Sequence, residues 1–332
     1  MKIVIVVPCY DEEPVLPETT RRLTELLGDL VARGKVGADS WICFVDDGSR
    51  DRTWALIEAA AQVSPLVRGL KLSRNRGHQA ALMAGLMNAD ADAVISVDAD
   101  LQDDLGAIEA MVDAHAGGAD VVYGVRRRRD TDTFFKRFTA EGYYRLLGAL
   151  GVEVVFNHAD YRLLSRRVLS ALASYRESNL FLRGIIPQLG FPSSVVHYDR
   201  AERFAGESKY PLVKMLSFAW QGITSFSAAP LRLITTIGAL VSVGSFGVAA
   251  WALWLRLFTP DAVPGWTSTV VPMYFLGGVQ LLCIGIIGEY LAKIYLEVKR
   301  RPAWFVEKGV GGETTDAGQA RDVRSIRTHP GA

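Results

Sequence analysis

Two carboxylates follow an apolar stretch near residue 100. Residues 93–97 are Ala-Val-Ile-Ser-Val, and Asp98-Ala99-Asp100 comes directly after them. This pattern predicts a buried parallel strand whose carboxyl end delivers both carboxylates into a crevice, which is where open α/β sheets bind ligands. Two hard carboxylates suit Mg²⁺ or Mn²⁺, whose coordination is usually completed by substrate phosphates. The alternative is an acidic turn that only caps the next helix.

Acidic side chains also follow two earlier apolar runs. Residues 2–7 lead into Pro8, Tyr10 and Glu12, and residues 41–45 lead into Asp46 and Asp47. The first turn has no glycine, which excludes the phosphate-binding loops of dinucleotide-binding and P-loop proteins. Tyr10 instead offers a face to a base, while carboxylates accept hydrogen bonds from base N–H groups and ribose hydroxyls. For Asp46 and Asp47 the alternative is a turn that leads into a helix N-cap.

The elements that must position these side chains alternate between strand and helix. Strands are predicted at residues 2–7, 41–45, 67–72, 93–97, 121–125 and 194–198. Helices are predicted at residues 14–33, 52–63 and 78–88. This alternation indicates an α/β fold with a parallel sheet and right-handed crossovers, so the acidic strand ends converge at one edge.

Length and composition narrow the class of protein. The 332 residues exceed one average domain, and 37 basic residues balance 36 acidic ones, which argues against a nucleic-acid partner. Three scattered cysteines and five scattered histidines predict neither a disulfide framework nor a zinc site. The chain starts directly with a strand pattern, so we expect no cleavable signal peptide. A positive mean hydropathy of +0.16 indicates a membrane portion.

Two uncharged runs near the C-terminus predict a membrane hairpin. Residues 233–255 and 270–288 contain no charged side chain, and each is long enough to cross a hydrocarbon core of about 30 Å. Basic residues precede the first run and follow the second, so the positive-inside rule places the large domain and both termini in the cytoplasm. We therefore expect a multi-pass protein of the cell (inner) membrane.

The predicted organisation has six parts. They are a cytoplasmic catalytic domain (1–210), an interfacial amphipathic helix (211–230), a first transmembrane helix (231–256), a short external loop (257–269), a second transmembrane helix with a cytoplasmic extension (270–302) and a disordered tail (303–332). A plain connector helix is the alternative for the second part. The tail prediction follows from its glycine, threonine and charge content.

Four motifs together resemble glycosyltransferase family 2. They are residues 7–13 (Val-Pro-Cys-Tyr-Asp-Glu-Glu), 46–49 (Asp-Asp-Gly-Ser), 72–81 (Leu-Ser-Arg-Asn-Arg-Gly-His-Gln-Ala-Ala) and 98–102 (Asp-Ala-Asp-Leu-Gln). The resemblance covers residues 1 to about 305 and is strongest to polyprenyl-phosphate glycosyltransferases, namely bactoprenol glucosyltransferases and dolichol-phosphate mannose synthases. It implies a GT-A type nucleotide-sugar-binding domain with a mostly parallel sheet, and a Mg²⁺ or Mn²⁺ ion held by Asp98, Asp100 and Gln102. Asp11 departs from the asparagine usual in the first motif.

The resemblance also assigns roles in the middle of the chain. Arg126 matches an arginine near the donor phosphates and is a candidate for catalysis and acceptor binding, although a run of four arginines such as 126–129 is most often a solvated face. Asp160 matches the position commonly proposed as catalytic base, and Arg162 would contact the acceptor phosphate. Asp160 could instead position the acceptor or Arg162, or simply form a buried pair that holds a turn.

A basic segment precedes the predicted membrane portion. Residues 200–210 resemble the Arg-x-x-Gly-x-Ser-Lys-Tyr segment of the family. The resemblance implies that Arg203 and Lys209 carry positive charge to the donor diphosphate and that Arg200 lies near the acceptor phosphate. A basic surface turn is the alternative.

These features predict an inverting transfer of a hexose from a nucleotide diphosphate sugar to polyprenyl phosphate at the cytoplasmic membrane face. The resemblance favours UDP-glucose, with GDP-mannose as an alternative donor. A transferase acting on a hydroxyl acceptor and a nucleotide-sensing flippase subunit are the other hypotheses. The partners would be the nucleotide sugar, the lipid phosphate and the membrane, with no nucleic acid; the sequence leaves homo-oligomerisation open.

Overall fold

A computed structural model describes residues 1–127, 158–175, 182–199, 229–258, 266–299 and 301–311. Internal contacts divide the chain into two compact units. The first contains Met1–Arg145, Glu153–Pro211 and Pro302–Ala332, and the second contains Leu146–Val152 and Leu212–Arg301. The predicted site residues Arg200, Arg203 and Lys209, residues 211–228 of the predicted interfacial helix and residues 259–265 of the predicted loop lie outside the described residues.

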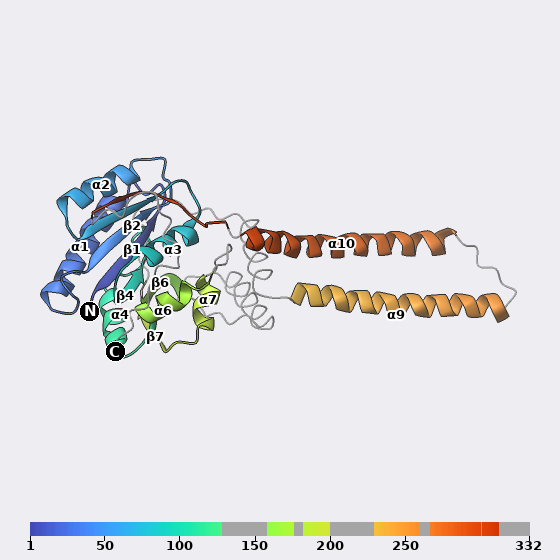
Figure 1. The fold of residues 1–332 in the computed structure, drawn as a ribbon. Helices are drawn as coiled ribbons and strands as arrows, with labels where there is room; N and C mark the ends of the chain where they lie inside the picture. Colours follow the sequence, from blue (N-terminus) through green and yellow to red (C-terminus); the bar gives the residue numbers. More distant parts are fainter. Residues whose placement is uncertain (128–157, 176–181, 200–228, 259–265, 300, 312–332) are drawn as a thin grey trace. The chain divides into compact units, whose positions relative to one another are not determined.

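The first unit is built on an eight-stranded sheet (Figure 1). Its strands are β1 (Ile3–Cys9), β2 (Trp41–Asp46), β3 (Val67–Leu72), β4 (Ala93–Ser96), β5 (Val121–Arg126), β6 (His158–Ser165), β7 (Ser193–Tyr198) and β8 (Val306–Val310). Their order is β7-β5-β6-β4-β1-β2-β3-β8. Only β6 and β8 pair antiparallel with their neighbours, which confirms the predicted α/β fold with a mostly parallel sheet.

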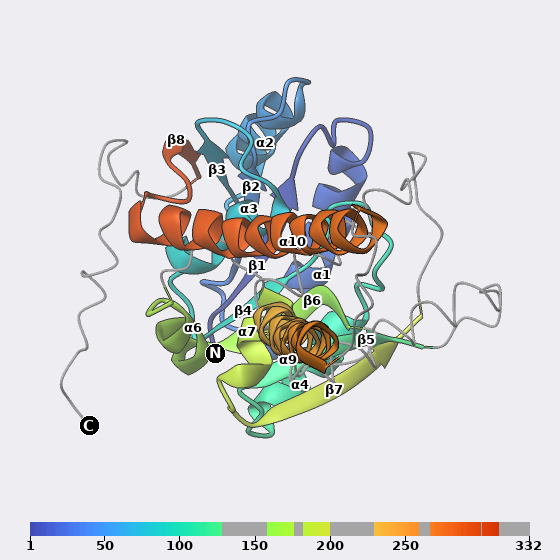
Figure 2. The same cartoon turned by 90° about the vertical axis from the view of Figure 1, so that its right-hand side faces the viewer.

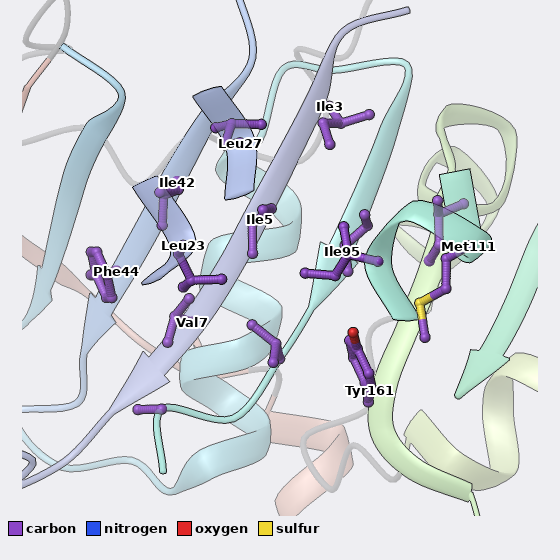
Figure 3. Close-up of a cluster of buried hydrophobic side chains, with 14 of the residues drawn as sticks. Ile3, Ile5, Val7, Leu23, Leu27, Ile42, Phe44, Ile95, Met111 and Tyr161 are labelled. Carbon is purple, nitrogen blue, oxygen red and sulfur yellow. The ribbon is translucent and has the colours of Figure 1, made fainter. Parts of the chain in front are cut away.

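Helices cover both faces of this sheet. They are α1 (Leu16–Ala32), α2 (Thr53–Val63), α3 (His78–Asn88), α4 (Ala107–Ala116), α6 (Arg166–Leu172) and α7 (Leu182–Gln188). Because successive strand residues point to opposite faces, Ile3, Ile5 and Val7 form one core with α1, α2 and α4 (Figure 3). Val6 points to the other face, where α3 approaches so closely that a Cβ on Gly85 would lie 2.3 Å from a Val6 methyl group.

Two strands were not anticipated from the sequence. We predicted a disordered tail from residue 303, but this is wrong for residues 306–310, which form β8 along β3 at one edge of the sheet, opposite β7 (Figure 2). Lys71 pairs with Glu307 at 3.3 Å, and the Ser73 N–H donates to the Phe305 carbonyl at 3.0 Å. The other is β6, which lies between β4 and β5.

The second unit contains two long helices, α9 (Ala229–Phe258) and α10 (Trp266–Lys299). Within the described part of the chain, one helical segment, Phe275–Lys299, is long and apolar enough to cross a membrane by length and composition, with a mean hydropathy of 1.7. The predicted spans 231–256 and 270–302 thus fall largely on helices. That both helices cross a membrane stays a prediction.

Candidate functional site

The loops after β1 and β2 are joined by hydrogen bonds. The Asp11 N–H donates to Ser49 Oγ (3.0 Å), the Arg50 N–H donates to Asp11 Oδ1 (2.8 Å) and the Glu12 N–H donates to Thr53 Oγ1 (2.9 Å). Asp11 has a left-handed φ of 53°, which short polar residues tolerate best. Its side chain acts as an acceptor for a backbone N–H, a role that the amide oxygen of asparagine also fills, so the departure from the family motif preserves this loop.

Pro8 and Tyr10 lie where β1 loses one neighbour. The pairing of β1 with β4 ends at Val6, whereas its pairing with β2 continues to Cys9. The missing N–H of Pro8 is therefore tolerated, although β1 is a central strand. Beyond this point Tyr10 is 38% exposed, so its ring is accessible to a ligand at the carboxyl end of the sheet.

Asp46 and Asp47 are both buried at the end of β2. The two carboxylate oxygens of Asp47 accept the backbone N–H groups of Arg76 (2.7 Å) and Gly77 (2.8 Å), so Asp47 fixes the turn that starts α3. Asp46 Oδ1 accepts the Ser49 N–H at 3.2 Å, while its Oδ2 is buried with no partner among the described residues. Burial raises the pKa of both carboxyls against these hydrogen bonds. Asp46 Oδ2 is thus an acceptor atom that the described residues leave unused.

Gly48 allows these loops to approach each other. Its φ is +71°, and a Cβ there would lie 2.7 Å from the Arg74 carbonyl carbon and from the Asn75 nitrogen. Only glycine adopts this backbone conformation without strain while the backbone at residues 74–75 lies so close. The Asp-Asp-Gly-Ser motif therefore has a structural reason for its glycine.

The loop after β4 carries the predicted metal ligands. The Asp98 side chain is 36% exposed, and burial of its carboxyl raises the pKa to about 6, opposed by the nearby His78. Asp100 Oδ1 accepts the Gln102 N–H at 3.2 Å. Leu101 between them has a left-handed φ of 56°, a strained conformation that typically clusters at functional sites.

These residues fit a divalent cation that also binds substrate. Asp98 and Asp100 supply hard oxygen atoms, and Gln102 Oε1 is buried with no partner in the described part of the chain. No group of three or more His, Cys, Asp or Glu side chains that could hold a metal occurs among the described residues. An ion at this loop would therefore take further ligands from a diphosphate or from water.

Asp160 is the centre of a charged cluster. Its carboxylate accepts hydrogen bonds from Gln79 Nε2 (3.1 Å), from Arg162 Nη2 and from Arg183 Nε and Nη2 (3.3 and 3.2 Å). His78 Nε2 lies 3.6 Å from Asp160 and 3.7 Å from Asp98, so it links the two carboxylates. Burial alone would raise the pKa of Asp160, but the nearby His78 and the charges of Arg162 and Arg183 hold it well below its ordinary value.

This cluster changes two of the predicted roles. A carboxylate whose pKa is held so low is a weak proton acceptor, which disfavours Asp160 as a general base and favours the positioning alternative. Arg162 is only 1% exposed and pairs with Asp160, so the structure does not present its side chain to an acceptor phosphate. Arg183, which is 36% exposed, is better placed to meet an anion.

Arg126 is the last residue of β5, and hydrogen bonds hold one side of its guanidinium. Its Nε donates to the Tyr198 hydroxyl (3.1 Å), and its Nη2 donates to Asp103 Oδ1 (3.3 Å). Its side chain remains 31% exposed, so a face is left for an anionic substrate. Burial would lower the pKa of Arg126, but Tyr198 and Asp103 raise it, and the group is a permanent cation.

Five residues of this site were not predicted from the sequence. They are His78, Gln79, Asp103, Arg183 and Tyr198. His78 and Gln79 lie in the motif 72–81, where their place at the first turn of a predicted helix was an available signal. Asp103, Arg183 and Tyr198 reach the site only through the sheet order, so nothing local in the sequence indicated them.

Comparisons with known proteins identify the family of this chain. A family model described as glycosyl transferase family 2 matches residues 4–173. The chain is 52% identical to the uncharacterized glycosyltransferase YkoT of Bacillus subtilis (strain 168), a match that covers 92% of this chain and 91% of that protein. It is 42% identical to the SfII prophage-derived bactoprenol glucosyl transferase of Shigella flexneri, covering 94% and 99%.

A solved structure shows a more distant likeness. Glucosyl-3-phosphoglycerate synthase from Mycobacterium tuberculosis, in complex with Mn²⁺ and UDP-glucose, has a TM-score of 0.43 and 19% identity, covering 67% of this chain and 77% of that chain. The assignment rests instead on the family model, which spans half of the chain, and on relatives that match almost end to end. The chain is a glycosyltransferase and belongs to glycosyl transferase family 2.

Proposed function

We propose that the enzyme transfers a hexose from a nucleotide diphosphate sugar to polyprenyl phosphate, with inversion at C1. The observation that carries this proposal is the 42% identity to a bactoprenol glucosyl transferase over 99% of that protein's length. The match extends through the two long C-terminal helices as well as the sheet domain. The name of that relative favours glucose as the sugar, and we propose UDP-glucose as the donor.

The chemistry of the acceptor agrees with the charged cluster at Asp160. A phosphate monoester has its second pKa near 6, so its oxygen is largely ionised at neutral pH and needs no base. That oxygen forms the new bond to C1 of the sugar, while the bond from C1 to the donor diphosphate breaks. A hydroxyl acceptor would need a base with a pKa near neutrality, and Asp160 is held well below this. Its role would be to orient Arg162, Arg183 and His78.

Asp98, Asp100 and Gln102 would hold the divalent cation, Mg²⁺ or Mn²⁺. Bound there, the cation would offset the charge that develops on the departing diphosphate. Arg126 would contribute a second positive charge from the end of β5, together with Arg203 and Lys209. Tyr10, Glu12 and Asp46 would contact the base and ribose, while Asp47 holds the loop beside them.

The membrane portion would confine the enzyme to the plane that contains its acceptor. We propose that α9 and α10 form the predicted hairpin, with the sheet domain and both termini on the cytoplasmic side. The apolar segment Phe275–Lys299 supports a membrane location, and the basic residues at its end and beyond it, Lys299 and Arg301, support the orientation. Confinement raises the local concentration of the lipid phosphate.

A direct assay tests the proposal. The full chain, purified in detergent or proteoliposomes, is incubated with polyprenyl phosphate, Mn²⁺ and labelled UDP-glucose, UDP-N-acetylglucosamine, UDP-galactose or GDP-mannose. We expect labelled glycolipid with UDP-glucose. Asp100→Ala should lower the rate by about 10²–10³-fold, the cost of removing one main electrostatic stabiliser. Asp39→Ala, an exposed carboxylate outside the site, is the matched control and should leave the rate unchanged.

Two results would contradict the proposal. If no donor gives glycolipid, a nucleotide-sensing role becomes the better hypothesis. If a folded Asp100→Ala protein makes glycolipid at full rate without added metal, the assignment of the cation to the loop after β4 is wrong.

A further inference from the structure

Side chains at or after the ends of three strands form one ring of hydrogen bonds, which we call the Asp103 ring. It consists of Asp103 in the loop after β4, Arg126 at the end of β5 and Tyr198 at the end of β7. The Tyr198 hydroxyl donates to Asp103 Oδ1 at 2.6 Å. Arg126 Nε donates to the same hydroxyl at 3.1 Å, and Arg126 Nη2 donates to Asp103 Oδ1 at 3.3 Å. Each member thus contacts the other two.

The ring lies mostly below the surface. The Asp103 side chain is 1% exposed and Tyr198 is 2% exposed, whereas Arg126 keeps 31%. Burial and the charge of Asp103 raise the pKa of Tyr198, so its hydroxyl stays protonated and donates to Asp103 at any physiological pH. A buried carboxylate held between a hydroxyl and a guanidinium makes strong, charge-assisted hydrogen bonds.

The ring orients the guanidinium of Arg126. This group is planar, and two of its nitrogens are engaged by Tyr198 and Asp103. Its plane is therefore fixed, and its remaining N–H groups form a preorganised fork for phosphate oxygens. A free arginine side chain at the end of a strand would lose far more rotamer freedom when it bound the same anion.

The same ring also holds the loop that carries Asp98 and Asp100. Leu101 in this loop has a strained φ of 56°, which persists only when the surroundings over-determine it. Two other bonds fix the loop backbone: Tyr161 Oη donates to the Asp104 carbonyl (2.9 Å) and Thr19 Oγ1 donates to the Ala99 carbonyl (2.8 Å). Through Asp103, the ring also connects this loop to the guanidinium of Arg126 at the end of β5.

We propose that Asp103 and Tyr198 are positioning residues that couple the loop after β4 to Arg126. They set the distance between the carboxylates of Asp98 and Asp100 and the guanidinium of Arg126. The cation that these carboxylates would hold and the guanidinium would then bind one diphosphate in a fixed geometry. Neither Asp103 nor Tyr198 touches the substrate; they act through Arg126. This inference rests on the proposed function, because it assumes that the anion is the donor diphosphate.

A double-mutant cycle in the full chain tests the coupling. Tyr198→Phe removes the hydroxyl but keeps the aromatic ring, which packs edge-on against Tyr161 at 5.2 Å and 82°. We expect kcat to fall about tenfold, with less than a twofold further fall when Tyr198→Phe is added to Arg126→Ala, because coupled residues act as one unit. Tyr175→Phe, the same change at a tyrosine after α6, is the control and should alter neither background.

Equal effects of Tyr198→Phe in both backgrounds, or no effect in either, would overturn the proposal. The same cycle on the affinity for UDP with Mn²⁺ should show the same non-additivity. This second measurement needs no acceptor, so it decides the inference even if the wild-type chain makes no glycolipid. If Tyr198→Phe does not fold, Asp103→Asn replaces it, since the amide keeps the volume and one acceptor oxygen. If the effect of Asp103→Asn is the same with and without Arg126→Ala, the proposal is likewise overturned.

Discussion

The carboxylate of Asp47 after β2 and that of Asp160 at the start of β6 lie at the same edge of one sheet, yet they are held in different ways. Asp47 is surrounded by neutral donors, the backbone N–H groups of Arg76 and Gly77. Asp160 is surrounded by charged ones, the side chains of Arg162 and Arg183. The first arrangement fixes the shape of loops, and the second places two guanidinium groups next to the proposed phosphate site.

The pKa shifts follow this difference. Burial raises the pKa of Asp47, because backbone dipoles only partly replace the lost hydration of its charge. The pKa of Asp160 is lowered despite comparable burial, because full positive charges lie within hydrogen-bond distance. Asp47 belongs to the half of the sheet formed by β1, β2, β3 and β8, and Asp160 belongs to the half formed by β4, β6, β5 and β7. Removing the negative charge should cost less at Asp47 than at Asp160.

The same substitution in the two halves gives the largest expected contrast. Asp160→Asn leaves the guanidinium of Arg162 buried without a counter-charge, which should destabilise the protein by about 3–5 kcal/mol. Asp47→Asn replaces one of two acceptor oxygens by a donor and should cost only about 1–2 kcal/mol. Thermal unfolding of the two variants beside wild type measures the difference. Equal melting temperatures would show that both carboxylates are held by the same kind of interaction.

A smaller effect is expected at the β8 edge of the first half. Gly311 has φ +74°, and a Cβ there would lie 2.4 Å from the Val67 carbonyl oxygen, whereas a Cβ on Gly309 meets nothing nearer than 3.8 Å. Gly311→Ala should cost at least about 1–2 kcal/mol from its left-handed backbone alone. Gly309→Ala is the matched control and should stay within about 0.5 kcal/mol.

Hydrogen exchange in peptides that contain β3 and β8 measures this effect directly. We expect faster exchange at residues 67–72 and 306–310 in Gly311→Ala, and wild-type rates in Gly309→Ala. Unchanged protection in both variants would mean that β8 does not depend on the turn at Gly311 to stay on the sheet.

The smallest effect concerns pH. With its pKa raised to about 6, Asp98 is protonated below that pH in the metal-free protein, and a protonated carboxyl does not bind a cation. The affinity for Mn²⁺, measured by titration, should therefore fall by up to about tenfold per pH unit below about 6. Asp160 should add no inflection there, because its pKa is lowered. A flat affinity between pH 5 and 7 would contradict the assignment.

The sign of the stability effect of Asp98 is opposite to that of Asp160. The folded state holds the Asp98 proton more tightly than the unfolded chain, so this contribution is present below pH about 3.8 and is lost as pH rises through about 6. The contribution of Asp160 is present above the ordinary carboxyl pKa and is lost only as pH falls through its lowered value.

Much of the sheet could be predicted because its signals are local. The apolar runs before Pro8, Asp46 and Asp98 correspond to β1, β2 and β4, and the acidic side chains follow them as expected. The order of residues 306–310 could not be predicted, because a five-residue edge strand with two charged residues and one glycine has the composition of a disordered tail. Its pairing with β3 supplies the order that its own sequence lacks.

The sequence by itself determined which strands end in carboxylates, since apolar periodicity depends on near neighbours along the chain. Only the tertiary structure decided which of these carboxylates faces a cation. Arg126 and Tyr198 are 72 positions apart and meet because β7 and β5 lie side by side. Asp160 meets His78 because β6 lies next to β4. The physical reason is that charge pairing depends on distance in space, which the order of strands in the sheet sets and local composition does not record.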